Sequence, residues 1–167
     1  MAVDNITLAL ISLKQYLEGF LNDQGWKGKY RVFLKDDPFL QGKEIVEKVT
    51  VQSKEIGLPI VLLSDSSAKS NIIELGSSPG MDYVRLSIVI IAKDGIQLRT
   101  LSNLLRREVN DLNYSIYNYE SRNEVVGIGS LNDVNMIDVS DYNSSSIASK
   151  YNSIINMTLE LDANSFT

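Results

Sequence analysis

The chain of 167 residues has a net charge of −5, and it contains no histidine and no cysteine. These absences exclude a histidine-based catalytic triad, a thiolate nucleophile and histidine–cysteine metal sites within the chain. A hydrophobic fraction of 44% is typical of a globular protein, so we expect residues 1–167 to form a single domain. We expect no cofactor, no bound metal and no enzymatic activity.

The charge is unevenly distributed along the chain. Residues 1–107 contain 14 Lys or Arg and 12 Asp or Glu, a net of +2, whereas residues 108–167 contain 2 and 9, a net of −7. An acidic chain is a poor general binder of DNA phosphates. The two halves suit head-to-tail association of identical subunits, although two differently solvated ends of one monomer would give the same pattern.

The first half of the chain predicts one helix followed by short strands. Apolar residues recur at helical spacing over residues 5–21, namely at Ile6, Leu10, Leu13, Leu17 and Phe20/Leu21. Lys14 and Glu18 interrupt this stretch, so we expect neither a signal peptide nor a membrane span, and we expect folding in the cytoplasm. Alternating or apolar runs predict strands at 29–34, 45–51, 59–63 and 71–75.

The second half predicts a central strand, a second helix and further strands. Asp94 is a candidate N-cap for a helix over 96–112. Strands are predicted at 83–92, 114–119, 125–138 (one strand or two) and 151–161. The serine-rich segment 140–149 is predicted to be a flexible loop in a free subunit. This order predicts an α+β fold, with a mixed, largely antiparallel sheet and two main helices packed on one face.

Three patterns could carry chemistry, and each has a simpler interpretation. Ser66 and Lys69 have Ser-x-x-Lys spacing, but the segment is polar and offers nothing to desolvate the lysine. The run Gly127-Ile128-Gly129 lacks a third glycine and a following helix, so a kinked strand is favoured over a phosphate site. The carboxylates at Asp36-Asp37 and around Asp133 fit turns better than a calcium loop.

Basic and aromatic residues alternate in the segment 26–35. Lys29, Arg31 and Lys35 share one face of the predicted strand. Three interpretations remain open: an edge strand protected by charge, a subunit-docking surface, and a site that binds single-stranded nucleic acid by stacking and charge.

The order of elements resembles that of the tail-terminator (tail-completion) proteins of long-tailed bacteriophages and, more loosely, of other phage neck proteins. The resemblance covers about half of the chain. It is carried by the N-terminal helix 6–21, the strand 82–91 with Asp94-Gly95 and the helix 98–112, and the closing strand 151–161. The family has no catalytic or ligand motif to transfer. The resemblance implies a homo-oligomeric ring, expected to be a hexamer, that caps the tail tube and presents a surface to the head.

The sequence therefore favours a structural phage assembly protein that is located in the virion tail or neck and assembled in the host cytoplasm. Expected partners are other copies of the chain, the tail tube protein, the sheath, and neck or connector proteins, while genomic DNA passes through without specific binding. The alternatives are a head–tail connector or stopper, a sheath-associated neck protein and, more distantly, a small enzyme that uses carboxylates or a Ser-Lys pair. The charge split predicts a subunit interface that joins Lys29, Arg31 and Lys35 to Asp133, Asp138 and Asp141.

Overall fold

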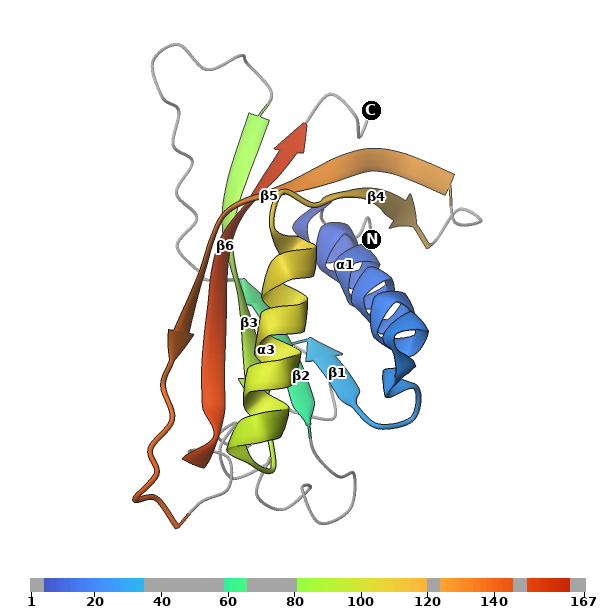
Figure 1. Cartoon of the computed structure of the whole chain (residues 1–167). Helices are drawn as coiled ribbons and strands as arrows, with labels where there is room; N and C mark the ends of the chain where they lie inside the picture. Colours follow the sequence, from blue (N-terminus) through green and yellow to red (C-terminus); the bar gives the residue numbers. More distant parts are fainter. Residues whose placement is uncertain (1–4, 35–58, 66–80, 120–123, 146–149, 163–167) are drawn as a thin grey trace.

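The structure is a computed structural model of the chain, which describes residues 5–34, 59–65, 81–119, 124–145 and 150–162 (Figure 1). In chain order its elements are α1 (Asn5–Leu21), the π-helical turn η1 (Asn22–Trp26), β1 (Arg31–Leu34), β2 (Ile60–Asp65), β3 (Met81–Ile91), α3 (Gly95–Val109), β4 (Asn113–Asn118), β5 (Glu124–Asp138) and β6 (Asn152–Asp162). The strands predicted at 45–51 and 71–75 lie outside the described residues.

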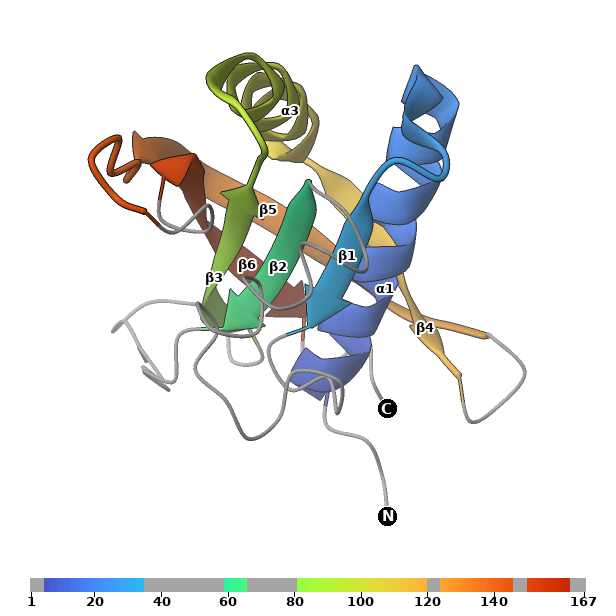
Figure 2. The same cartoon turned by 90° about the horizontal axis from the view of Figure 1, so that it is seen from below.

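The strands form one six-stranded sheet in the order β1-β2-β3-β6-β5-β4. β1 and β2 are parallel, and every other neighbouring pair is antiparallel. Both helices pack against the same face of the sheet (Figure 2). The predicted α+β fold, with a mixed, largely antiparallel sheet and two helices on one face, is confirmed.

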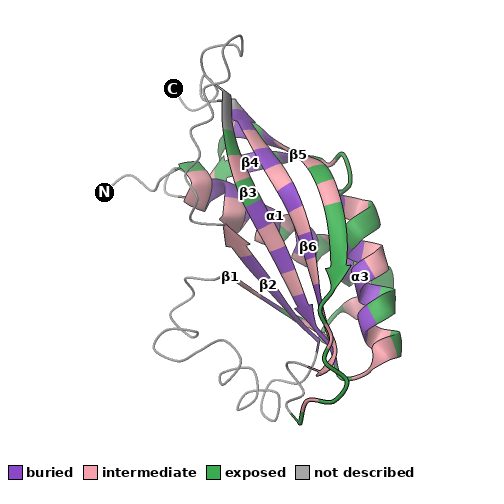
Figure 3. Cartoon of the chain, turned by 90° about the vertical axis from the view of Figure 1, so that its left-hand side faces the viewer, coloured by how far each residue is buried: buried purple, intermediate pink, exposed green. Residues whose placement is uncertain are grey.

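Side-chain alternation along the central strands builds the core. In β3, Leu86, Ile88 and Ile90 are buried towards the helices, and in the neighbouring β6 Ile155 and other alternate residues do the same. Figure 3 shows this alternation of buried and half-buried residues along both strands. On the opposite face, a second small cluster consists of Ile60 and Ile91, with Phe33 and Val89 packed against it.

Helix α1 lies between the two edge strands of the curved sheet, β1 and β4 (Figure 2). The Tyr30 hydroxyl, next to β1, donates to the Glu18 carbonyl at 2.7 Å. From β4, the buried Tyr114 hydroxyl donates to the Ala9 carbonyl at 3.1 Å. The backbone N–H of Tyr117 donates to Ser12 Oγ at 3.0 Å, so a helix side chain occupies part of the edge of β4.

This position makes the buried face of α1 differ from the predicted one. Leu13, Leu17 and Leu21 are buried as expected, but Ile6, Leu10 and Phe20 are only half-buried. Leu8, Ala9 and Ser12 are buried in addition. The reason is that α1 contacts the sheet at two edges, so its buried surface is broader than one apolar stripe.

Helix α3 begins as predicted and ends earlier. Asp94 accepts a hydrogen bond from the backbone N–H of Gln97 at 2.7 Å, which confirms it as the N-cap. The helix stops at Val109 rather than at residue 112, and Asp111 follows with φ 56°. Leu112 then leads into β4 and accepts a backbone hydrogen bond from Leu131 at 2.8 Å.

Strand β5 is one long strand, which settles the choice between one strand and two. β4 pairs with its residues 124–130, and β6 pairs with its other side from Gly129 to Asp138, beyond the reach of β4. The pairing with β6 shifts between Asn132 and Asn135, where Asp133 has φ 54°. The strand therefore bends at this bulge, as its curved course in Figure 1 shows.

Candidate functional site: two oppositely charged ends of the sheet

The basic residues of the predicted interface lie at the β1 end of the sheet. Lys29 belongs to a turn that follows η1, in which its N–H donates to the Trp26 carbonyl at 2.9 Å and Gly28 has φ 74°. Lys27, which was not among the predicted interface residues, lies in the same turn. Arg31 is the first residue of β1. All three basic side chains are exposed. The predicted Lys35 lies outside the described residues.

An open groove of about 450 Å³ runs between β1 and α1. It is lined by Lys14, Glu18, Asn22, Gly28, Tyr30, Arg31, Val32 and Phe33. Lys14 and Glu18 form an ion pair at 3.6 Å. Arg31 has no ion-pair partner within the described residues. Arg31 is therefore the charge of the groove that is not compensated within the described residues.

The acidic residues of the predicted interface lie in the second half of β5 and in the turn after it. Asp133 is exposed at the bulge. Asp138 is the last residue of β5, and Asp141 follows in the turn, where its side chain accepts a hydrogen bond from the Asn143 N–H at 3.1 Å. Among residues 124–145, all three carboxylates are on exposed residues.

Asp138 already interacts within its own turn. The Ser140 hydroxyl and then its backbone N–H donate to the Asp138 carboxylate and hold its pKa below the usual value. The Ser140 N–H lies 2.9 Å from Asp138 Oδ1. The Tyr142 hydroxyl and the positive charge of Arg99 act in the same direction. Part of the charge of Asp138 is thus compensated inside one subunit.

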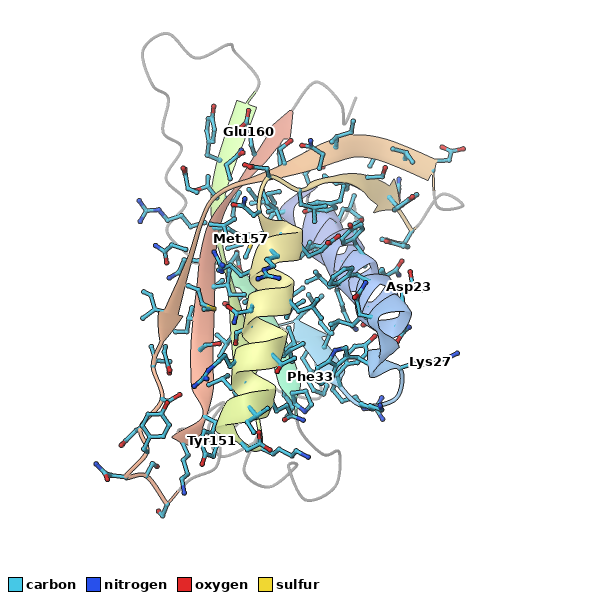
Figure 4. The ribbon with its side chains drawn as sticks, viewed as in Figure 1. Asp23, Lys27, Phe33, Tyr151, Met157 and Glu160 are labelled. Carbon is cyan, nitrogen blue, oxygen red and sulfur yellow. The ribbon has the colours of Figure 1, made fainter. Side chains whose placement is uncertain are left out.

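The fold places these two charged groups on opposite sides of the molecule. β1 is the terminal strand at one end of the sheet, and the second half of β5 lies beyond the reach of β4 near the other end. In Figure 4, Lys27 lies at the right of the molecule, and Tyr151, which precedes β6, lies at the lower left. The basic and acidic groups therefore belong to two separate surfaces of one subunit.

Sequence reasoning missed a row of exposed apolar residues at the acidic end. Met136, Ile137 and Val139 are 38%, 48% and 41% exposed. Figure 3 shows this half of β5 as an exposed strip along the sheet. The sequence did contain a signal for this surface. Met136 and Ile137 are adjacent apolar residues, and they break the alternation expected of a strand with one solvated face.

The aromatic residues of segment 26–35 pack inward. Trp26 and Tyr30 contact the main core, and Phe33 packs against Ile60 and Ile91. Burial also raises the pKa of Tyr30, with a smaller contribution from the charge of Glu18. Each of the three residues stays half-buried, and Tyr30 and Phe33 also line the groove beside Arg31, so the three interpretations of this segment stay open.

The other candidate motifs are placed as follows. Gly127 and Gly129 lie within β5 and pair with β4, as the kinked-strand interpretation predicts. Ser66, Lys69 and the Asp36-Asp37 pair lie outside the described residues. No group of three or more metal-ligating side chains occurs in the part of the chain that the structure describes.

The turn that follows β5 overlaps the serine-rich segment 140–149. The Ser144 N–H donates to the Asp141 carbonyl at 3.0 Å, and Ser140 Oγ contacts both the N–H and the carbonyl of Asn152. Residues 146–149 lie outside the described residues. The flexibility of this segment in a free subunit stays a prediction.

Among the described helices, none is both long enough and apolar enough to cross a membrane. A scan against protein-family models and a search of curated proteins gave no match to this chain.

Proposed function

We propose that the chain is a structural bacteriophage assembly protein of the tail-terminator type. In this proposal, copies of the chain form a ring that caps the tail tube in the virion and docks it to the neck or head. The observation that carries the proposal is the placement of exposed basic residues at one end of the sheet and exposed acidic residues at the other.

A closed ring of identical subunits requires a heterologous interface, in which two different surfaces of the subunit meet. Surfaces on opposite sides of a subunit and with opposite charge satisfy this requirement. A surface that pairs with itself would instead bring Asp133, Asp138 and Asp141 against their own copies, and like charges in contact oppose association. The charge arrangement therefore favours a ring. It opposes a twofold dimer in which the acidic surfaces of two subunits meet.

Charge alone is too weak to hold such a ring together. Exposed ion pairs contribute about 0.2–1 kcal/mol each, whereas micromolar association requires about 8 kcal/mol. Burial of apolar surface must supply most of the difference. Met136, Ile137 and Val139 offer exposed apolar surface beside the acidic residues, so attraction and burial can act at the same contact.

The charge of the chain also suits the passage of DNA. Residues 108–167 carry a net charge of −7, from 2 basic and 9 acidic residues. A lumen lined by part of this region would repel phosphates and let the genome pass without binding.

Native mass spectrometry of the Arg31→Glu variant tests the interface. We expect this change to reduce the population of rings, and we expect Asp141→Lys in the same chain to restore part of it. Arg107→Glu is the matched control, because it makes the same charge change at an exposed position of α3. Equal ring populations in the wild-type protein and Arg31→Glu would show that the proposed pairing is wrong.

Co-purification tests the position in the virion. A terminator stays with headless tails, whereas a head–tail connector stays with tailless heads. Recovery of the chain with tails that lack heads supports the terminator role, and recovery with heads alone would replace it by the connector role.

A further inference from the structure

Within the described residues, the outer edges of the sheet include β1, β4 and the second half of β5. Residues 124–128 of β5 also have no strand on the side away from β4, and residues 81–85 of β3 have none on the side away from β6. The edge of β4 is partly occupied inside the subunit, because the N–H of Tyr117 donates to Ser12 Oγ at 3.0 Å. Tyr119 also reaches the same helix, through its hydroxyl and Gln15. Among these edges, β1 and the second half of β5 are the two that lie beside the exposed basic and acidic residues of the candidate site.

The hydrogen-bond pattern shows which groups of β5 face outward. Val139 donates its N–H to the carbonyl of Asn152. Ile137, two residues before Val139, is paired with Ile154. In an antiparallel ladder, alternate residues exchange hydrogen bonds with the partner strand. Met136 and Asp138, which alternate with these two residues, therefore point their N–H and carbonyl groups away from β6. Beyond the bond made by Leu131, no described residue pairs with this edge.

An exposed strand edge with apolar side chains is a template for the addition of another strand. Natural edges are protected by charge, bulges or cover, and the bulge at Asp133 marks where the free half of β5 begins. Beyond it, Met136 and Ile137 are 38% and 48% exposed on opposite faces of the strand. A strand that is added here would cover apolar surface on both faces and complete the backbone hydrogen bonds.

The other available edge lies in the groove beside β1. The Arg31 N–H donates to the Pro59 carbonyl at 3.2 Å, and Arg31 pairs with Ile60 in the parallel ladder. The next residue, Val32, consequently directs its backbone groups away from β2. Val32 lines the open groove, whose rim carries Lys14 and Arg31. The backbone of β1 therefore borders the groove beside Arg31, although the Val32 side chain itself is buried.

We propose that the free edge of β5 in one copy, residues 134–138, pairs with the edge of β1 in the next copy, so that the sheet continues from subunit to subunit. The occupant is a second copy of this chain, because its acidic β5 edge and basic groove are complementary. Two β5 edges would instead bring like carboxylates together. The inference rests on the proposed ring and adds the backbone contact that joins its subunits.

Cysteine cross-linking tests this pairing, since the natural chain has no cysteine and each introduced thiol is unique. A full-length chain that carries Arg31→Cys and Ile137→Cys is treated with a short bismaleimide cross-linker. Both residues lie on the same face of the sheet. We expect a ladder of covalent multimers on a denaturing gel. Ile96→Cys with Ile137→Cys is the control, because Ile96 is 81% exposed but lies at the start of α3.

The cross-linking outcomes separate this inference from the ring proposal. If native mass spectrometry shows rings but the Arg31→Cys, Ile137→Cys chain gives no covalent multimers, the strand pairing is wrong and the ring proposal stands. Efficient homodimers of the Ile137→Cys chain alone would also overturn it, because they require two β5 edges to meet. A chain that stays monomeric at every concentration would overturn both proposals.

Substitutions at Met136 test the backbone contribution. Met136→Pro removes an N–H that points away from β6, so the ladder inside the subunit is kept. We expect it to weaken assembly about tenfold or more, since hydrogen bonds between subunits are lost. Met136→Val keeps the N–H and an apolar side chain, and we expect wild-type assembly. Circular dichroism confirms that both variants fold. Equal assembly of the two variants, or equal loss in both, would contradict strand pairing.

Discussion

The close approach of β4 and β5 at Gly129 makes a sharp stability prediction. A Cβ at this position would lie 2.8 Å from Cε1 and Cζ of Tyr114 and 3.0 Å from its hydroxyl oxygen. Tyr114 cannot simply move outward, because it is 4% exposed and its hydroxyl donates to the Ala9 carbonyl at 3.1 Å. Gly129→Ala therefore forces the ring to shift within the core.

The magnitude follows from two contributions. Overpacking of a core costs about 1–3 kcal/mol. Displacement of the Tyr114 hydroxyl from Ala9 costs about 1 kcal/mol more. We expect Gly129→Ala to lower the free energy of unfolding by about 2–4 kcal/mol in total. Urea titration followed by circular dichroism measures it, because the midpoint and the slope together give that free energy.

A second glycine provides the matched control. Gly19 lies in α1, is exposed, and has no atom within 4 Å of an added Cβ. We expect Gly19→Ala to stabilise the protein by about 0.5–1 kcal/mol, because alanine loses less backbone freedom in a helix. In a double-mutant cycle, Tyr114→Leu should relieve part of the cost of Gly129→Ala. A Gly129→Ala protein within about 0.5 kcal/mol of the wild type would refute the reasoning.

Two further hydrogen bonds give predictions of their own. Ser102 of α3 and Ser153 of β6 are buried with their hydroxyl oxygens 2.6 Å apart, so Ser102→Ala alone should cost about 1–3 kcal/mol, and the double alanine variant should cost less in urea titration. The Tyr16 hydroxyl of α1 donates to the Glu108 carboxylate of α3. This hydrogen bond, together with burial, raises the pKa of Tyr16 from 10.0 to about 12. The native state thus holds this proton more tightly, and the resulting stability is present below pH 10 and lost as the pH rises through about 12. Tyr16→Phe should remove that part of the pH dependence, and an unchanged alkaline unfolding profile would contradict the role of this contact.

The elements with strong local signals were predictable from the sequence. The alternation over 151–161 identified β6 and its buried face, and Asp94-Gly95 identified the start of α3. Local patterns also gave the strand nature of Gly127-Ile128-Gly129. These features depend on residues that are close in sequence, which is why a single sequence was sufficient.

Features that depend on distant residues were not predictable. The buried Ser12 looks like a polar interruption of the α1 stripe, and its role appears only when β4 brings the N–H of Tyr117 to it, 105 residues later in the chain. The order of the strands sets this contact, and no local pattern encodes the order. The free edge of β5 also depends on distant residues. It exists because β4 pairs with β5 only as far as Ser130, and β5 continues to Asp138.

The candidate site was predictable in its charge and not in its geometry. The sequence identified Arg31 and Asp133 as members of opposite groups, but the sheet order was needed to place the groups on opposite sides. Sequence reasoning also treated Asp138 as equivalent to Asp133, whereas Ser140 already binds the Asp138 carboxylate. The exposed Met136 and Ile137 were overlooked because apolar residues in a strand are usually assigned to a core.

The central claim is that this chain works by associating with copies of itself through two different surfaces. Native mass spectrometry of the purified full-length protein measures this most directly, because it resolves each stoichiometry present. The account predicts one closed oligomer of defined size, expected to be a hexamer, whose population falls in Arg31→Glu and is unchanged in Arg107→Glu. A protein that remains monomeric at all concentrations, or that stops at a dimer, would contradict it.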